Sequence, residues 1–122
     1  MSVRGVCSLG LAPTARVWLG GRAEEVRHRL GGLLPLVLRP AVGPLDALLI
    51  TPREVDEWAY FLGKHASRLW PRGRAWLIAE SPVPWDDDAS RAAAAGCGLR
   101  FVVREEPWPG LIADGFAAGA GS

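Results

Sequence analysis

Short apolar runs separated by glycine and proline dominate the pattern of hydrophobic and polar positions along this chain. Their length, and the Gly and Pro residues that bound them, are typical of buried strands. Leu45–Ile50 is the clearest, because it is apolar apart from one Asp, as strands covered on both faces of a parallel sheet are. The runs that we expect to form strands are Ala15–Leu19, Pro35–Arg39, Leu45–Ile50, Arg74–Glu80, Leu99–Glu105 and Leu111–Asp114.

Three segments have the spacing or the composition of helices. The strongest runs from Arg53 to about Leu69, where apolar residues recur every three or four positions and mark one face. Thr51 and Pro52 precede it, and we expect them to be its N-cap and its first helical residue. The other two segments are Arg22–Leu30, which ends at a glycine pair, and the alanine-rich Ala89–Ala95.

Strands that alternate with helices predict parallel pairing with right-handed crossovers. The last two strands are joined without a helix, so we expect a hairpin or an added edge strand there. The pattern therefore predicts one α/β domain with a small Rossmann-like, mostly parallel sheet, flanking helices and a C-terminal antiparallel strand. We expect Met1 to Pro13 to be an irregular lead-in and Gly115 to Ser122 to be a flexible tail.

The composition narrows the class of protein. The chain has 122 residues, of which 49% are hydrophobic and 22% charged, as in ordinary soluble domains. A net charge of +1 disfavours a dedicated nucleic-acid binder. Cys7 and Cys97 are isolated, which indicates neither a disulfide framework nor a zinc site and fits a reducing cytoplasm. We see no signal peptide and no apolar run long enough to span a bilayer.

Three stretches of the second half carry a family resemblance. Leu45–Ile50 is similar to the fourth strand of class I S-adenosylmethionine methyltransferases. Leu69–Glu80 is similar to the fifth strand of that family with the turn before it, and Ala92–Val103 is similar to its last helix with the sixth strand. Leu111–Asp114 then matches the inserted seventh strand of that family. The chain also resembles short bacterial methyltransferase-like proteins. The resemblance, which covers Leu45 to about Phe116, implies a Rossmann-like fold and S-adenosylmethionine as cofactor.

The first half departs from that family. A cofactor-binding member has a Gly-rich loop after its first strand, where the backbone approaches the methionine moiety, and an acidic residue at the end of its second strand for the ribose. Here the first strand is followed only by Gly20-Gly21, and the second ends in Arg39-Pro40. The chain is also too short between Leu38 and Leu45 for a third strand and its helix. The absence of that strand would leave an exposed sheet edge, which favours a dimer.

The candidate site residues follow the predicted central strands. Ligands of open α/β sheets bind outside the carboxyl ends of the strands, so we place a candidate cofactor site at Gly20, Gly21, Thr51, Glu80 and Ser81. The alternatives are a plain strand-to-helix turn for the glycine pair and a helix cap for Thr51. No residue is assigned a catalytic role.

Other polar residues have structural interpretations. Asp46 lies at the start of its strand, which favours a structural role. We expect His28 and His65 to be surface residues, because no catalytic arrangement surrounds them in the sequence. The consecutive aspartates Asp86–Asp88 suit a helix start better than a metal, so no metal site is predicted.

The six tryptophans divide into two groups. We expect Trp18, Trp58 and Trp76 to lie in the core. The other three are next to prolines in expected turns, where they form either a binding surface or packing onto the core: Trp70, Trp85 and Trp108.

Two functions remain open at this point. The intact second half and the missing cofactor motifs favour a non-catalytic methyltransferase-like domain that acts through a protein partner or as a homodimer. The alternative is a minimal binder or enzyme for S-adenosylmethionine or a nucleotide-type small molecule, with its site at the carboxyl ends of the central strands.

Overall fold

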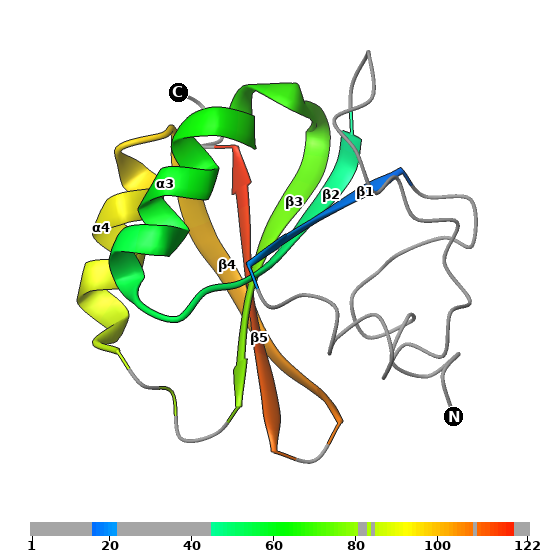
Figure 1. The fold of residues 1–122 in the computed structure, drawn as a ribbon. Coiled ribbons are helices and arrows are strands. Elements are labelled where there is room, and N and C mark those ends of the chain that lie inside the picture. Colours follow the sequence, from blue (N-terminus) through cyan, green and yellow to red (C-terminus); the bar gives the residue numbers. More distant parts are fainter. Residues whose placement is uncertain (1–15, 22–44, 81–82, 84, 109, 119–122) are drawn as a thin grey trace.

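Five strands form one sheet in the computed structural model, which describes residues 16–21, 45–80, 83, 85–108 and 110–118 (Figure 1). The strands lie in the order β1-β2-β3-β5-β4. β1 pairs with β2 and β2 with β3 in parallel, whereas β5 is antiparallel to both of its neighbours. The strands are β1 (Val17–Gly21), β2 (Leu45–Thr51), β3 (Leu69–Glu80), β4 (Leu99–Trp108) and β5 (Leu111–Ala118).

Two helices connect the strands of the second half. α3 (Val55–His65) leads from β2 through the short 3₁₀ turn η1 (Ala66–Arg68) to β3, and α4 (Asp87–Ala95) leads from β3 to β4. Both lie on the same side of the sheet (Figure 1). The hairpin of β4 and β5 inserts β5 between β3 and β4. The predicted α/β class, the mostly parallel sheet and the antiparallel last strand are therefore confirmed.

Apolar side chains fill both faces of the sheet. One face carries Trp76, which packs with Val17, Leu49 and other strand residues. The face under the helices carries Trp58 of α3 and Phe116 of β5, whose ring centroids are 5.3 Å apart. The Trp58 indole N–H also donates to the backbone oxygen of Ser90 at 3.0 Å, which joins α3 to α4. Because Trp18, Trp58 and Trp76 are all buried, the predicted core tryptophans are confirmed.

The boundaries around α3 differ from the prediction. The helix begins at Val55 rather than Arg53 and ends at His65. β3 then begins at Leu69 and runs through Pro71 and Gly73, which were expected to break the chain. The reason is an irregular register: Leu45 pairs with Leu69, but Ala47 pairs with Arg74. Residues between those pairs form a bulge, where a proline and a glycine are tolerated.

The C-terminal strand is longer than predicted. β5 continues past Asp114 to Ala118, so the expectation of a flexible tail is wrong for residues 115–118. Packing explains the difference: a Cβ on Gly115 would lie 2.9 Å from the Trp76 ring, and Phe116 is fully buried. β4 likewise extends to Trp108.

Several predictions fall outside the described residues. They are the lead-in over residues 1–13, the helix over 22–30, the strand over 35–39 and the end of the tail over 119–122. None of the described helices is both long and apolar enough to cross a membrane.

Candidate functional site

Parallel pairing brings the carboxyl ends of β1 and β2 together. Gly20 pairs with Ile50 and Gly21 with Thr51, so three predicted site residues meet at one edge of the sheet. α3 and α4 also begin on this side, because each follows the carboxyl end of a parallel strand. We call this side the carboxyl edge. It is where open α/β sheets bind ligands.

The backbone of Gly21 has a conformation that only glycine adopts easily. Its φ is +62°, and a Cβ there would lie 2.9 Å from the carbonyl carbon of Thr51 and 3.2 Å from Oε1 of Glu57. Any side chain would therefore meet both strain and a close contact. The backbone of Gly21 consequently stays bare beside two oxygen atoms.

Gly20 has a different reason to be glycine. A Cβ on this buried residue would lie 2.9 Å from Cη2 of Trp18, whose ring folds back over it. Both glycines belong to β1, so the expected end of the strand at Leu19 is wrong. Gly20 therefore serves the packing of Trp18.

Thr51 does not cap α3. It is the last residue of β2, and the N-cap of α3 is Glu54, which makes no side-chain capping bond. The helix-cap interpretation of Thr51 is therefore wrong. Its Oγ1 is buried and has no hydrogen-bond partner in the part of the chain that the structure describes. A buried hydroxyl without a partner costs about 1–3 kcal/mol, so Thr51 is suited to a bound partner.

Glu57 lies beside Gly21, although the sequence analysis did not single it out. It lies in the first turn of α3, and its Oε1 accepts a hydrogen bond from the backbone N–H of Arg53 at 3.0 Å. This bond folds the carboxylate back toward Gly21. An acidic residue in the first turn after a strand end was the only signal, and most such residues serve the helix dipole alone.

The other two predicted site residues are not brought to this position. β3 pairs with β2 as far as Leu77 opposite Ile50 and then continues for three residues to the exposed Glu80. β2 ends at Thr51, and Glu80 lies two residues beyond the position of β3 that is level with Thr51, which is a distance of roughly 6–7 Å along the strand. Ser81 lies outside the described residues.

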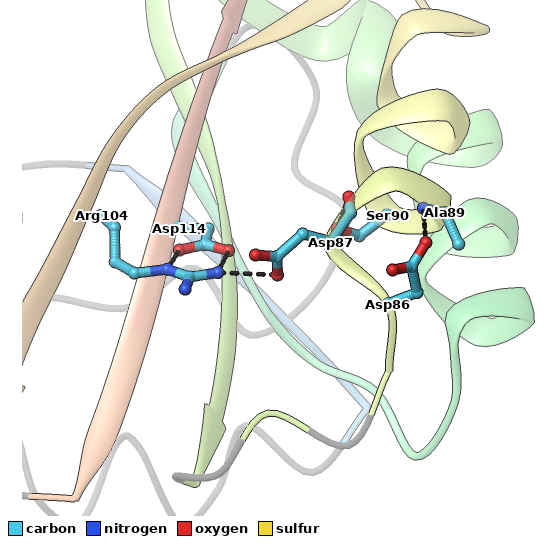
Figure 2. Close-up of polar contacts among 6 residues, drawn as sticks. All are labelled: Asp86, Asp87, Ala89, Ser90, Arg104 and Asp114. Atoms are coloured by element: carbon cyan, nitrogen blue, oxygen red, sulfur yellow. Dashed lines mark hydrogen bonds and ion pairs between the residues drawn. The ribbon is translucent and has the colours of Figure 1, made fainter.

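The aspartates at the start of α4 have structural partners (Figure 2). Asp86 is the N-cap and accepts from the backbone N–H of Ala89 at 3.2 Å. Asp87 binds Arg104 of β4 at 2.9 Å. The described residues contain no group of three His, Cys, Asp or Glu side chains that could hold a metal. The interpretation of these aspartates as a helix start is therefore confirmed by their contacts.

Arg104 links α4 to two strands. Its Nε and Nη2 donate to the two carboxylate oxygens of Asp114, at 2.6 and 2.8 Å, while Nη2 also reaches Asp87 (Figure 2). These hydrogen bonds, chiefly those to Asp114, raise the pKa of Arg104 above its usual range. The guanidinium thus holds the start of α4 against β4 and β5.

Two further polar residues have structural contacts. Asp46 Oδ2 accepts from the backbone N–H of Arg16 at 2.7 Å, as its expected structural role requires. His65 is half-buried rather than on the surface, and its ring stacks on Trp18 at 3.9 Å between centroids. Burial lowers the pKa of His65, and the charges of Arg68 and Lys64 lower it further. His28 lies outside the described residues.

Two of the proline-flanked tryptophans lie in strands rather than in turns: Trp70 in β3 and Trp108 in β4. Trp85 is partly buried against the core under the helices. For Trp85, packing onto the core is therefore the correct alternative.

Comparisons with known proteins show the fold. No family model and no curated protein sequence matches the chain. Among solved structures, it is similar to a TehB-like SAM-dependent methyltransferase from Corynebacterium glutamicum, with a TM-score of 0.61, 13% identity and coverage of 97% of this chain and 87% of that one.

Two other structures agree. The ribosomal protein L11 methylase from Lactobacillus delbrueckii subsp. bulgaricus has a TM-score of 0.65 at 9% identity, covering 96% of this chain and 76% of that one. The CcbJ methyltransferase from Streptomyces caelestis has a TM-score of 0.60 at 11% identity, covering 98% of this chain and 88% of that one. The chain therefore has the Rossmann-like fold of S-adenosylmethionine-dependent methyltransferases.

Proposed function

We propose that this chain binds an S-adenosylmethionine-type ligand at the carboxyl edge of its sheet, beside Gly21 and Thr51. The observation that carries the proposal is the left-handed and exposed Gly21 at the end of β1, whose backbone a ligand can reach from solvent. The similarity to methyltransferase structures supports this choice of ligand. The unpartnered hydroxyl of Thr51 supports binding at the same edge.

The alternative is a non-catalytic domain that acts through a protein partner or as a homodimer. The packing of Trp85 onto the core removes one of the tryptophans on which that hypothesis relied. It stays a prediction, as does a cytoplasmic location.

Calorimetric titration with S-adenosylmethionine and S-adenosylhomocysteine tests the proposal. We expect saturable binding by the parent chain and an affinity at least tenfold lower in Gly21→Ala, because the new methyl group would clash with the Thr51 carbonyl and displace the end of β1. Gly63→Ala is the matched control: Gly63 lies in α3, and a Cβ there meets nothing within 4 Å.

Gly63→Ala should bind as the parent does. Both variants need a melting curve first, because a left-handed alanine costs about 1–2 kcal/mol in stability. No binding by the parent at millimolar ligand would end the proposal and leave the protein-partner hypothesis. Unchanged binding by Gly21→Ala would move the site away from this edge.

A further inference from the structure

We propose that protonation of His65 weakens ligand binding beside Gly21 by releasing the Trp18 ring that supports β1. This inference rests on the proposed function and adds to it a regulation by pH. His65 is the last residue of α3 and lies at the end of that helix away from the carboxyl edge. It therefore acts as a positioning residue and does not touch the ligand.

Two packing contacts connect the end of α3 to the end of β1. The His65 ring lies against the Trp18 ring, with 3.9 Å between the centroids and 33° between the planes. The Trp18 ring packs in turn against the backbone of Gly20, where a Cβ would lie 2.9 Å from Cη2 of the ring. Gly20 precedes Gly21, whose left-handed backbone the proposed site requires. A displacement of the Trp18 ring is therefore passed directly to the end of β1.

The Trp18 ring is held mainly by one helix. Phe61 lies on it with 5.4 Å between the ring centroids, and His65 follows Phe61 by one turn of α3. Trp18 is buried, whereas His65 is only half-buried, so the His65 ring can turn out to solvent while α3 stays in place. Its departure would leave the Trp18 ring with Phe61 as its one aromatic contact among the described residues.

The charged form of His65 does not fit this position. The Nδ1 atom is buried and has no hydrogen-bond partner in the described part of the chain. A neutral ring can leave that nitrogen without a proton, whereas a charged ring carries a proton on both nitrogens. A buried N–H without an acceptor is unfavourable. An imidazolium is attracted by an indole ring, but that attraction supplies no acceptor for Nδ1.

The charged groups around His65 act in the same direction. Burial is the largest cause that lowers the pKa of His65, and the cations Arg68 of η1 and Lys64 of α3 lower it further. β1 has no titratable side chain, and no carboxylate among the described residues raises that pKa. The stacked, neutral ring is therefore the form present near pH 7.5, and the stack is lost as the pH falls through the lowered pKa of His65.

Ligand titrations at two pH values test the inference. The parent, His65→Gln and His28→Gln are titrated with S-adenosylhomocysteine at about pH 7.5 and about pH 5.5, at a temperature where each protein is folded. His65→Gln keeps a polar side chain that cannot become charged. His28→Gln changes the only other histidine of the chain and is the matched control. NMR follows the His65 ring and the Gly21 amide over the same pH range without ligand.

We expect the affinity of the parent and of His28→Gln to fall about threefold or more at the lower pH, as when about a third of the molecules stay competent to bind. The affinity of His65→Gln should depend less on pH. In the parent, the Gly21 amide should titrate with the same midpoint as the His65 ring. Lys64→Gln removes one of the cations and should move that midpoint to higher pH.

An equal fall of affinity in the parent and His65→Gln would overturn the inference and leave the proposed function intact. A Gly21 amide that does not follow the His65 ring would overturn it as well, as would a pH dependence that disappears in His28→Gln. If the parent binds the ligand at neither pH, the proposed function falls, whereas the Gly21 amide still decides whether protonation of His65 reaches β1.

Discussion

The contact between Arg104 and Asp114 provides the sharpest test of the energetics of this fold. Asp114 sits in β5 with only 3% of its side chain exposed, and Arg104 is its bidentate partner (Figure 2). Arg104→Met keeps most of the aliphatic stem of the arginine but removes its charge. The substitution leaves a buried carboxylate without its cation.

The size of the effect follows from the exposure of the two partners. Breaking a buried ion pair by removing one side costs about 3–5 kcal/mol. Because 38% of the Arg104 side chain is exposed, water can reach part of the gap, and we lower the expected cost to about 2 kcal/mol. The second contact, to Asp87, joins side chains that are 38% and 42% exposed and should contribute less than about 1 kcal/mol.

A double-mutant cycle measured by urea denaturation separates the two contacts. We expect a coupling energy of about 2 kcal/mol between Arg104→Met and Asp114→Asn, and below about 1 kcal/mol between Arg104→Met and Asp87→Asn. For a domain of 122 residues, Arg104→Met alone should lower the melting temperature by roughly 8 °C. The reasoning is refuted if the coupling to Asp114 does not exceed the coupling to Asp87.

Two other contacts give predictions of their own. Burial lowers the pKa of His65 in the folded chain below 6.5, so its neutral form contributes stability that is present above about pH 6.5 and is lost as the pH falls below that value. When the pH is lowered from about 7.5 to about 5.5, the melting temperature of His65→Gln should therefore fall by less than that of the parent. An equal fall in both proteins would contradict the burial of His65. Trp58→Phe removes the indole N–H that donates to Ser90, and should lower the free energy of unfolding by about 2 kcal/mol in urea denaturation. A cost below about 0.5 kcal/mol would mean that the bond contributes little to holding α3 against α4.

The fold was predictable from the sequence where burial and periodicity agree. The sequence of β2 is apolar on both faces, and in the sheet β2 is a central strand with a neighbour on each side. The apolar face of α3 was visible from its spacing, and Trp58 and Leu62 are the residues that it buries. Asp86 was recognisable as part of a helix start because an N-cap depends only on neighbours a few residues away. These features are local, so a single sequence is enough to find them.

Contacts between distant segments account for most of the errors. Nothing near Gly115 in the sequence indicates that Trp76 lies against it, yet that packing keeps β5 ordered to Ala118. Pro71 and Gly73 look like chain breakers until the irregular register between β2 and β3 is known. Propensities describe each residue in isolation, whereas the sheet decides which of them can be accommodated.

The candidate site depends on where α3 begins. A helix capped by Thr51, with Pro52 as its first residue, would have satisfied the Thr51 hydroxyl and placed Glu57 in the second turn. The helix begins instead at Val55, which leaves Thr51 in β2 and puts Glu57 in the first turn, where its carboxylate bonds to Arg53. A shift of three residues, from an N-cap at Thr51 to one at Glu54, therefore turns a capping residue into an unpartnered hydroxyl and an ordinary helical glutamate into a carboxylate beside Gly21. Helix boundaries are the least predictable part of a helix, and at the carboxyl edge of this sheet the proposed ligand contacts depend on one.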